Sequence, residues 1–220
     1  MKANPLRGFQ VDPREIRYVG KDLQRPECIL AERDGTLWSA DARGGVMRID
    51  PDGTQTLVAP GAADSSVSFE DRYVNTLGSL PNGLAFDAEG SFLIANFGAD
   101  RLERLTRKGE LTTLLDNIDG QPIGKANFVT RDSRGRLWLT VTTRMIPWTR
   151  HVETMSHDGY IAVIDQRGAR IVADRLCGAN ELRFDASEQY RRRRHGLVKR
   201  ARPNRVRRIS HARFVPGERR

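Results

Sequence analysis

The sequence lacks the marks of several protein classes. Its 220 residues include only two cysteines, Cys28 and Cys177, which are too few for a disulfide framework or a zinc knuckle, and we interpret them as small buried hydrophobic residues. No apolar run approaches the roughly 18 residues that a membrane span needs, and the start, MKANPLRGFQ, has no apolar stretch of signal-peptide type. Helical periodicity is nearly absent. With 38% apolar and 30% charged residues, the sequence predicts a globular, soluble, cytoplasmic protein.

The net charge of +9 is confined to one end of the chain. Residues 191–220 contain 13 Lys and Arg residues against one acid, whereas residues 1–190 contain 24 basic and 27 acidic residues. The segment 1–190 is therefore mildly acidic. Any inference from charge to a polyanionic partner depends on the segment 191–220 alone.

A repeat organises the chain before Arg191. Four segments share one register, with a carboxylate or carboxamide at the first position and an acid five residues later; they start at Glu27, Asn82, Asn127 and Asn180. In the first three segments a glycine follows eight residues after the start, at positions 35, 90 and 135. An acid that bonds its own backbone and a glycine at positive φ fit a tight turn. Short apolar runs flank each turn, so each segment predicts a β-hairpin.

A second predicted hairpin follows each of the first three segments, with a charged turn that contains Gly53, Gly109 or Gly168. Four strands per unit, with unit starts 55, 45 and 53 residues apart, are typical of β-propeller blades. A β-sandwich would also give regular strands, but it would not repeat a polar residue at one register position. We therefore predict an all-β fold, an incomplete propeller with about three full blades and the first strand of a fourth.

The register also predicts a site. The innermost strand of each propeller blade runs along the central channel, so equivalent positions of successive blades face one another. Glu27, Asn82, Asn127 and Asn180 are equivalent by register, and their oxygens are the hard donors that Ca²⁺ prefers, with Mg²⁺, Mn²⁺ or Zn²⁺ as alternatives. The other interpretation is that each Asn only caps a strand edge or a turn.

These segments resemble a known family. RPECILAERDGTLWSADARGGVMRIDPDG, LPNGLAFDAEGSFLIANFG, KANFVTRDSRGRLWLTVTTR and GANELRFDA, between Arg25 and Ala186, are similar to the family of gluconolactonase, regucalcin (senescence marker protein) and luciferin-regenerating enzyme. The resemblance implies a six-bladed propeller that holds one divalent cation and acts on lactones or related small esters. It assigns Glu27, Asn180 and Asn127 to the metal, and Asn127 and Asn82 to the substrate.

Two segments bear on whether the site is complete. The family has a further Asp, usually given as metal ligand and general base, and this sequence has no matching segment after Asn180; the catalytic residue is therefore unassigned, and we expect lactone hydrolysis to be impaired. The segment Thr142–Gly159 is longer than a hairpin turn and carries Trp148, His151 and His157. We interpret it as a roof over the channel mouth or, alternatively, as a surface extension with solvated histidines.

The Arg-rich segment has two interpretations. Its abrupt start at Arg191, without a Gly/Ser linker, is typical of an out-of-frame reading of a GC-rich gene, and its composition predicts disorder. Alternatively it is a basic arm that binds nucleic acid through phosphates, although it lacks interleaved aromatic residues. The predicted division is therefore a partial propeller over 1–190 and a tail over 191–220. The predicted function is metal-dependent hydrolysis of a small lactone, and the alternative is a binding or scaffold protein without turnover.

Overall fold

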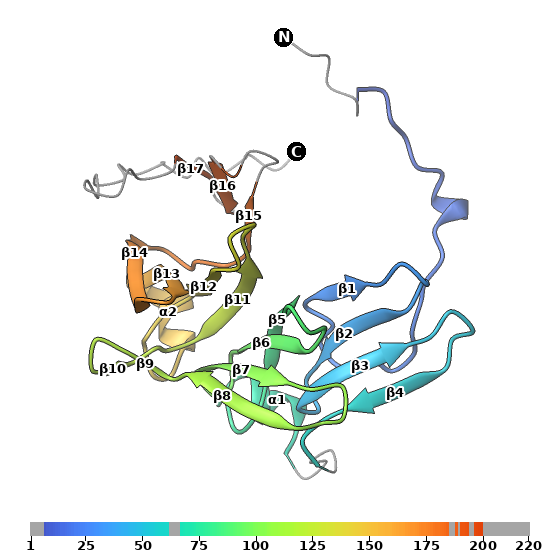
Figure 1. Cartoon of the computed structure of the whole chain (residues 1–220), viewed down its shortest axis with the longest axis horizontal. Helices are drawn as coiled ribbons and strands as arrows, with labels where there is room; N and C mark the ends of the chain where they lie inside the picture. Colours follow the sequence, from blue (N-terminus) through green and yellow to red (C-terminus); the bar gives the residue numbers. More distant parts are fainter. Residues whose placement is uncertain (1–6, 62–66, 185–187, 189, 194–195, 200–220) are drawn as a thin grey trace.

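In the computed structural model, the described residues form four antiparallel sheets arranged around a common centre, and a separate two-stranded ribbon (Figure 1). The structure describes residues 7–61, 67–184, 188, 190–193 and 196–199. A 3-10 helix at Pro13–Glu15 precedes the first sheet. The all-β fold and the incomplete propeller predicted from the repeat are thereby confirmed.

Each of the first three sheets has four strands in chain order. Blade 1 comprises β1 (Ile29–Ala31), β2 (Leu37–Asp41), β3 (Gly45–Ile49) and β4 (Gln55–Val58); blade 2 comprises β5 (Pro81–Phe86), β6 (Phe92–Asn96), β7 (Arg101–Leu105) and β8 (Leu111–Leu115); blade 3 comprises β11 (Ala126–Arg131), β12 (Leu137–Val141), β13 (Gly159–Asp165) and β14 (Gly168–Leu176). A short ribbon of β9 (Asn117–Ile118) and β10 (Gln121–Pro122) links blades 2 and 3. The first strand of each blade lies nearest the centre (Figure 1).

The fourth sheet extends beyond the single strand expected from the sequence. It contains β15 (Leu182–Phe184), β16 (Tyr190–Arg193) and β17 (Gly196–Lys199), paired in that order. The predicted boundary between positions 190 and 191 therefore falls inside β16. Residues 200–220, most of the predicted tail, lie outside the described residues.

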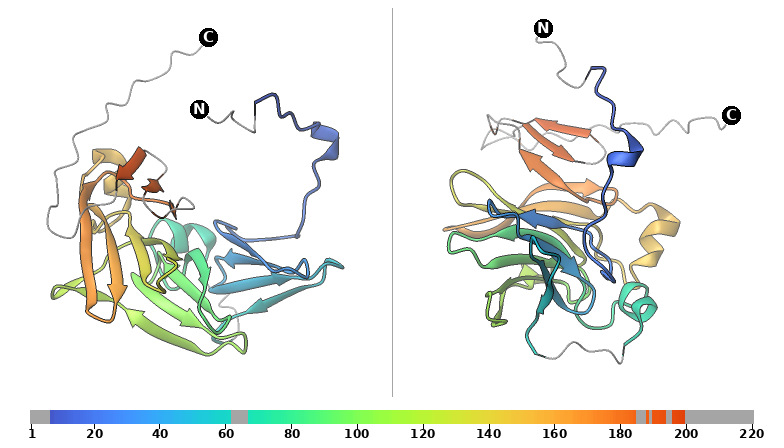
Figure 2. Two further views of the ribbon diagram at one scale, coloured as in Figure 1. Left: turned by 45° about the horizontal axis from the view of Figure 1, so that its top comes forward. Right: turned by 90° about the vertical axis from the view of Figure 1, so that its right-hand side faces the viewer.

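Two short α-helices interrupt the strand pattern. The first, α1 (Phe69–Tyr73), precedes β5, and the second, α2 (Thr149–Thr154), lies between β12 and β13. Because β12 runs antiparallel to β11 and ends where β11 begins, both helices lie at the end of the blades where the inner strands start, and they project from the same face (Figure 2, right). Within the described residues no helix is long and apolar enough to cross a membrane.

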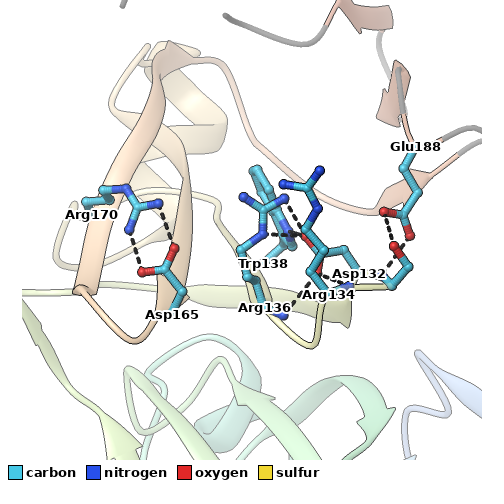
Figure 3. Close-up of polar contacts among 8 residues, drawn as sticks. Asp132, Arg134, Arg136, Trp138, Asp165, Arg170 and Glu188 are labelled. Atoms are coloured by element: carbon cyan, nitrogen blue, oxygen red, sulfur yellow. Dashed lines mark hydrogen bonds and ion pairs between the residues drawn. The ribbon is translucent and has the colours of Figure 1, made fainter. Parts of the chain in front are cut away.

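The repeated acid forms the turn that the sequence predicts. In blade 2 the Asp87 Oδ1 atom accepts hydrogen bonds from the backbone N–H groups of Glu89 and Ser91, both at 2.8 Å, and Gly90 has a φ of +81°. In blade 3 the other carboxylate oxygen has a second partner, because Asp132 Oδ2 accepts from the indole N–H of Trp138 at 3.0 Å (Figure 3). In blade 3 the repeated acid therefore closes the turn and also anchors a core side chain, whereas in blade 1 Glu32 accepts from the Trp38 indole N–H and Asp34 accepts from a backbone N–H group of the turn.

The core is continuous from blade to blade. One cluster of buried residues draws on the inner strands of all four sheets and includes Cys28, Leu84, Phe128 and Leu182. Gly83 allows blades 2 and 3 to approach closely, because a Cβ at this position would lie 2.5 Å from the Cα of Phe128. The expectation of a buried cysteine holds for Cys28, whereas Cys177 is only partly buried.

Candidate functional site

The four predicted site residues lie where the inner strands begin. Asn82 and Asn127 are the second residues of β5 and β11, and Glu27 and Asn180 each precede their strand, β1 or β15, by two positions. The inner strands contact one another in succession, β1 with β5, β5 with β11, and β11 with β15. Residues at the same position of the repeat therefore lie on inner strands that are neighbours in space.

Asn82 and Asn127 both sit at a break in strand pairing. On β5 the pairing passes from Pro81–Asn96 to Gly83–Ala95, and on β11 it passes from Ala126–Val141 to Phe128–Thr140. Each Asn is therefore the extra residue of a β-bulge, which removes it from the alternation of the strand and changes the direction of its side chain. The same bulge therefore occurs at the same repeat position in blades 2 and 3, at the end of the channel where the inner strands begin.

A chain of hydrogen bonds connects three of the four predicted residues. The Nδ2 group of Asn82 donates to the backbone carbonyl of Asn127 at 2.7 Å, and the Nδ2 group of Asn127 donates to Thr142 Oγ1 at 3.0 Å. The Thr142 hydroxyl in turn donates to the carbonyl of Ala179 at 3.0 Å. Within β12, the Thr140 hydroxyl donates to the carbonyl of Asn180 at 2.5 Å. Blades 2, 3 and 4 are joined through their site residues.

These bonds use the carboxamide N–H groups and leave the carboxamide oxygens without partners. Asn82 and Asn127 are 4% and 7% exposed, and the Oδ1 atom of each is buried and has no hydrogen-bond partner among the described residues. A buried polar atom without a partner is unfavourable by about 1–3 kcal/mol. Two such oxygens on adjacent inner strands are unlike the turn-capping Asn of the alternative interpretation, and they are suited to accept a cation or a donor group of a ligand.

Glu27 differs from the three asparagines because its side chain is 46% exposed. Its Oε1 atom lies 3.3 Å from an Nη2 atom of Arg25, and the Arg25 guanidinium stacks on the rings of Tyr73 and Phe97 at 5.0 and 5.8 Å. Burial lowers the pKa of Arg25, and the charge of Glu27 partly opposes that effect. No hydrogen bond links Glu27 to the three asparagines among the described residues.

Cys28, the residue after Glu27, packs in the core cluster that also contains Leu182 of the fourth sheet. Burial raises the pKa of the Cys28 thiol, and the charges of Arg183, Glu181 and Glu27 have smaller effects on it. Glu181, which follows Asn180 and is about half exposed, is a second carboxylate at this end of the channel that the sequence pattern did not single out.

The chemistry of the donors defines which metals could fit. Among the described residues, no group of three or more His, Cys, Asp or Glu side chains gathers in one place. A site at the start of the inner strands would thus combine carboxamide oxygens with one or two carboxylates. Such oxygen donors suit Ca²⁺, Mg²⁺ or Mn²⁺ better than Zn²⁺, which prefers nitrogen and sulfur ligands.

The segment Thr142–Gly159 contributes an aromatic cluster at the same end. Trp148 packs edge-on against Tyr73 and Phe97, both at a centroid separation of 5.2 Å, and its indole N–H donates to the carbonyl of Tyr73 at 2.7 Å. The helix α2 thereby ties blade 3 to α1. His151 is 5% exposed, so the interpretation of this segment as a surface extension with solvated histidines is wrong for His151, whereas His157 is exposed.

A buried cation also lies near this cluster. The Nζ atom of Lys125 is 2.9 Å from Asp100 Oδ1 and donates to Thr76 Oγ1 at 3.0 Å, and it lies 5.9 Å from the centre of the Phe97 ring. Arg25 and Lys125 share one register position, two residues before Glu27 and Asn127, and neither was predicted as a site residue. A basic residue at this position in blades 1 and 3 is the sequence signal that could have indicated them.

A cavity of about 390 Å³ lies away from these residues. It is lined at the opposite end of the first inner strand by Glu32, Asp34, Thr36, Trp38, Arg48, Thr56, Val58 and Arg107. Its charged groups are already paired, since both guanidinium Nη atoms of Arg107 bond to the Glu32 carboxylate at 3.0 and 2.9 Å. We assign this region to the contact between blades 1 and 2 and not to the candidate site.

Comparison with known proteins bears on the fold. No protein-family model matches the chain, and no curated protein matches it in sequence. Among solved structures it is similar to a gluconolactonase from Xanthomonas campestris (19% identity, 72% of this chain and 50% of that chain, TM-score 0.54) and to a catalytically inactive variant of virginiamycin B lyase from Staphylococcus aureus with quinupristin (15% identity, 84% and 58%, TM-score 0.54). It is also similar to a chain of the nidogen/laminin complex (21% identity, 81% and 62%, TM-score 0.55).

These similarities concern the architecture alone, because the highest of the three sequence identities is only 21%. The chain spans between 50% and 62% of the length of these three neighbours. Two of the neighbours are named as enzymes and one is named as part of a complex between proteins. By its fold, this chain is therefore similar to propeller proteins that include a gluconolactonase and a virginiamycin B lyase.

Proposed function

We propose that the chain binds a divalent cation at the start of its inner strands and hydrolyses a small lactone there. The observation that carries the proposal is the pair of buried carboxamide oxygens of Asn82 and Asn127, each placed by a β-bulge and each without a partner among the described residues. Glu27, Asn127 and Asn180 would hold the cation, and Asn82 and Asn127 would contact the substrate. The resemblance to gluconolactonases and the fold neighbour of that activity support the substrate class.

The residues of the chain have separable roles in this scheme. A bound divalent cation supplies the polarisation of the lactone carbonyl. Asn82 and Asn127 are held in place by their N–H bonds to the next blade and to Thr142, so their oxygens need little reorganisation on binding. Arg25 keeps the Glu27 side chain at the channel end through their ion pair. The aromatic cluster of Tyr73, Phe97 and Trp148 supplies apolar surface at the same end.

The test is a titration of the whole chain with Ca²⁺ and Mn²⁺ by calorimetry, together with a pH-stat assay on glucono-δ-lactone. Glu27→Gln and Asn127→Leu should each weaken metal binding and metal-stimulated hydrolysis by about 10-fold or more. The matched controls, Glu15→Gln and Asn117→Leu, change exposed residues of the same types away from the site and should stay within about 2-fold. Equal behaviour of site and control variants would overturn the proposal.

A second candidate is a binding protein without turnover. It is favoured by the fold neighbour that belongs to a protein complex. Saturable metal binding without hydrolysis of any lactone would favour this candidate. The basic residues that could contact nucleic acid lie mainly within 200–220, outside the described residues.

A further inference from the structure

The proposed hydrolysis needs a base, and the acids near the site are already committed. Glu27 is paired with Arg25 and would be a metal ligand, and Asp100 is paired with the Lys125 ammonium at 2.9 Å. Asp41 is fully buried and is held by two guanidinium contacts from Arg43, at 2.7 Å each. Glu181 lies 3.7 Å from a guanidinium nitrogen of Arg183, so each of these four carboxylates already has a cationic partner.

His151 offers a different kind of group at the same end of the blades. Its Nδ1 atom lies 2.7 Å from Ser156 Oγ, and the Ser156 hydroxyl donates to Asp158 Oδ1 at 2.5 Å. The second carboxylate oxygen of Asp158 accepts from Thr143 Oγ1 and from the backbone N–H of Arg144, both at 2.7 Å. The imidazole is thus one end of a chain of hydrogen bonds. The other end is held by Thr143 and Arg144, which directly follow β12.

The direction of this chain sets the tautomer of His151. A carboxylate can only accept, so the Ser156 hydrogen points to Asp158 and the Ser156 oxygen must accept from Nδ1–H. Burial acts to raise the pKa of Asp158, but hydrogen bonds from Ser156, Thr143 and Arg144 outweigh it and hold that pKa below its ordinary value. The proton of neutral His151 therefore resides on Nδ1, and Nε2 presents a lone pair with no hydrogen-bond partner among the described residues.

The lone pair faces the segment that leads into the fourth inner strand. A Cβ built on Gly178 would lie 3.1 Å from Nε2, and Gly178 is two positions before Asn180. The next carbonyl, that of Ala179, accepts the bond from Thr142 that also fixes Asn127. His151 therefore lies against Gly178, and Asn127 is linked through the Thr142 hydroxyl to the next residue, Ala179.

Burial favours the neutral form of His151. Burial lowers the pKa of the imidazole, the Asp158 carboxylate partly opposes this, and His157 acts in the same direction as burial. From the other packed segment, Cys177 donates its thiol to the carbonyl of Met155 at 3.5 Å. At pH 7 the ring is therefore available to take up a proton.

We propose that His151 is the general base and general acid of the lactone hydrolysis, with Ser156 and Asp158 as positioning residues; this rests on the proposed function. The oxygen of a water molecule attacks the lactone carbonyl carbon while Nε2 takes the proton of that water. The ring C–O bond then breaks, and the imidazolium returns the proton to the departing alkoxide oxygen. One water is added, the product is a hydroxy acid, and His151 ends as it began.

The test compares His151→Gln and His151→Ala with His157→Gln, which changes an exposed histidine of the same segment. Metal-stimulated hydrolysis of glucono-δ-lactone by both His151 variants should fall by about 10²- to 10⁴-fold in kcat, with unchanged Ca²⁺ binding and loss of the ascending limb of the pH profile. Added imidazole should restore part of the rate of His151→Ala, which a merely structural role would not allow. Ser156→Ala should shift the pH limb and retain part of the rate, and His157→Gln should match the wild type.

Two failures can be told apart. If the wild-type chain is active and His151→Gln, folded by circular dichroism, keeps its rate and pH limb, the proposal for His151 is overturned and the proposed function stands. If the wild-type chain hydrolyses no lactone under any metal condition, the proposed function fails and the role of His151 falls with it.

Discussion

The contact between blades 1 and 2 permits a quantitative prediction at Arg107. This side chain leaves the β7–β8 turn of blade 2 and crosses to blade 1, where it forms a two-pronged ion pair with Glu32. Its guanidinium also lies 4.7 Å from the centre of the Trp38 ring and 5.4 Å from that of Phe92. Together with the Trp38 indole N–H, Arg107 holds the pKa of Glu32 below its ordinary value.

Arg107→Lys keeps the charge but removes the planar fork and most of the stacking. The side chains of Arg107 and Glu32 are 38% and 31% exposed, so the ion pair is partly screened and stabilises by about 0.5–1 kcal/mol. Stacking on the aromatic rings adds about 0.5–1 kcal/mol. Because Lys retains part of the ion pair, we expect a loss of about 1 kcal/mol, which lowers the melting temperature of a chain of this size by about 2–4 °C.

Arg170→Lys is the matched control. Arg170 also forms a two-pronged ion pair, with both contacts to Asp165 at 2.8 Å (Figure 3), but this pair lies within one hairpin and does not stack on a ring among the described residues. We expect a smaller loss of stability than for Arg107→Lys, because solvent screens this exposed pair. Calorimetric unfolding of the two variants in parallel is the test. Equal losses of stability would refute the claim that stacking of Arg107 on the aromatic rings stabilises the contact between blades 1 and 2.

Three further predictions concern the site and its surroundings. Gly83→Ala should destabilise the chain by about 2 kcal/mol or more, because its Cβ would overlap the backbone of Phe128; chemical denaturation measures this. Thr142→Val should weaken Ca²⁺ binding by about 10-fold in calorimetry, because Asn127 loses the acceptor that orients it. It should also lower the free energy of unfolding by about 1–3 kcal/mol, because the Asn127 N–H group and the Ala179 carbonyl lose their partner. Burial raises the pKa of Glu103 above its ordinary value of 4.5. The stability gained by protonating Glu103 is therefore fully present below pH 4.5 and is lost as the pH rises through the raised pKa. Glu103→Gln should raise the melting temperature at pH 7, and this gain should vanish at about pH 4.

The repeat made most of the fold predictable. An acid and a glycine at fixed spacing predict the position of a tight turn. The turn at Asp87 has the side-chain to backbone hydrogen bonds that such a pair predicts. The same register brought Asn82 and Asn127 onto adjacent inner strands. Local sequence carries this information because a hairpin is a local structure.

The rest of the candidate site depends on contacts between blades, which no local pattern encodes. The β-bulges at Asn82 and Asn127 leave no mark in composition, since any residue can be the extra one. The burial of His151 and its bond to Ser156 follow from the packing of α2 against the segment before β15. Arg25 and Lys125 likewise acquire their surroundings from parts of the chain that are distant in sequence, Arg25 from the Tyr73 ring and Lys125 from the Asp100 carboxylate.

The β-bulges have a consequence for how this scaffold can change. A residue that stands outside the strand ladder contributes no pairing to its neighbours, so the sheet is largely indifferent to its identity. Asn82 and Asn127 can therefore be exchanged without disturbing the strand ladder, but each exchange removes the bond that the carboxamide N–H group donates to the Asn127 carbonyl or to Thr142, whereas Gly83 fixes the distance between blades. Substitution libraries at the two bulged positions should therefore yield folded proteins with altered ligand preference most often when the new side chain keeps a hydrogen-bond donor.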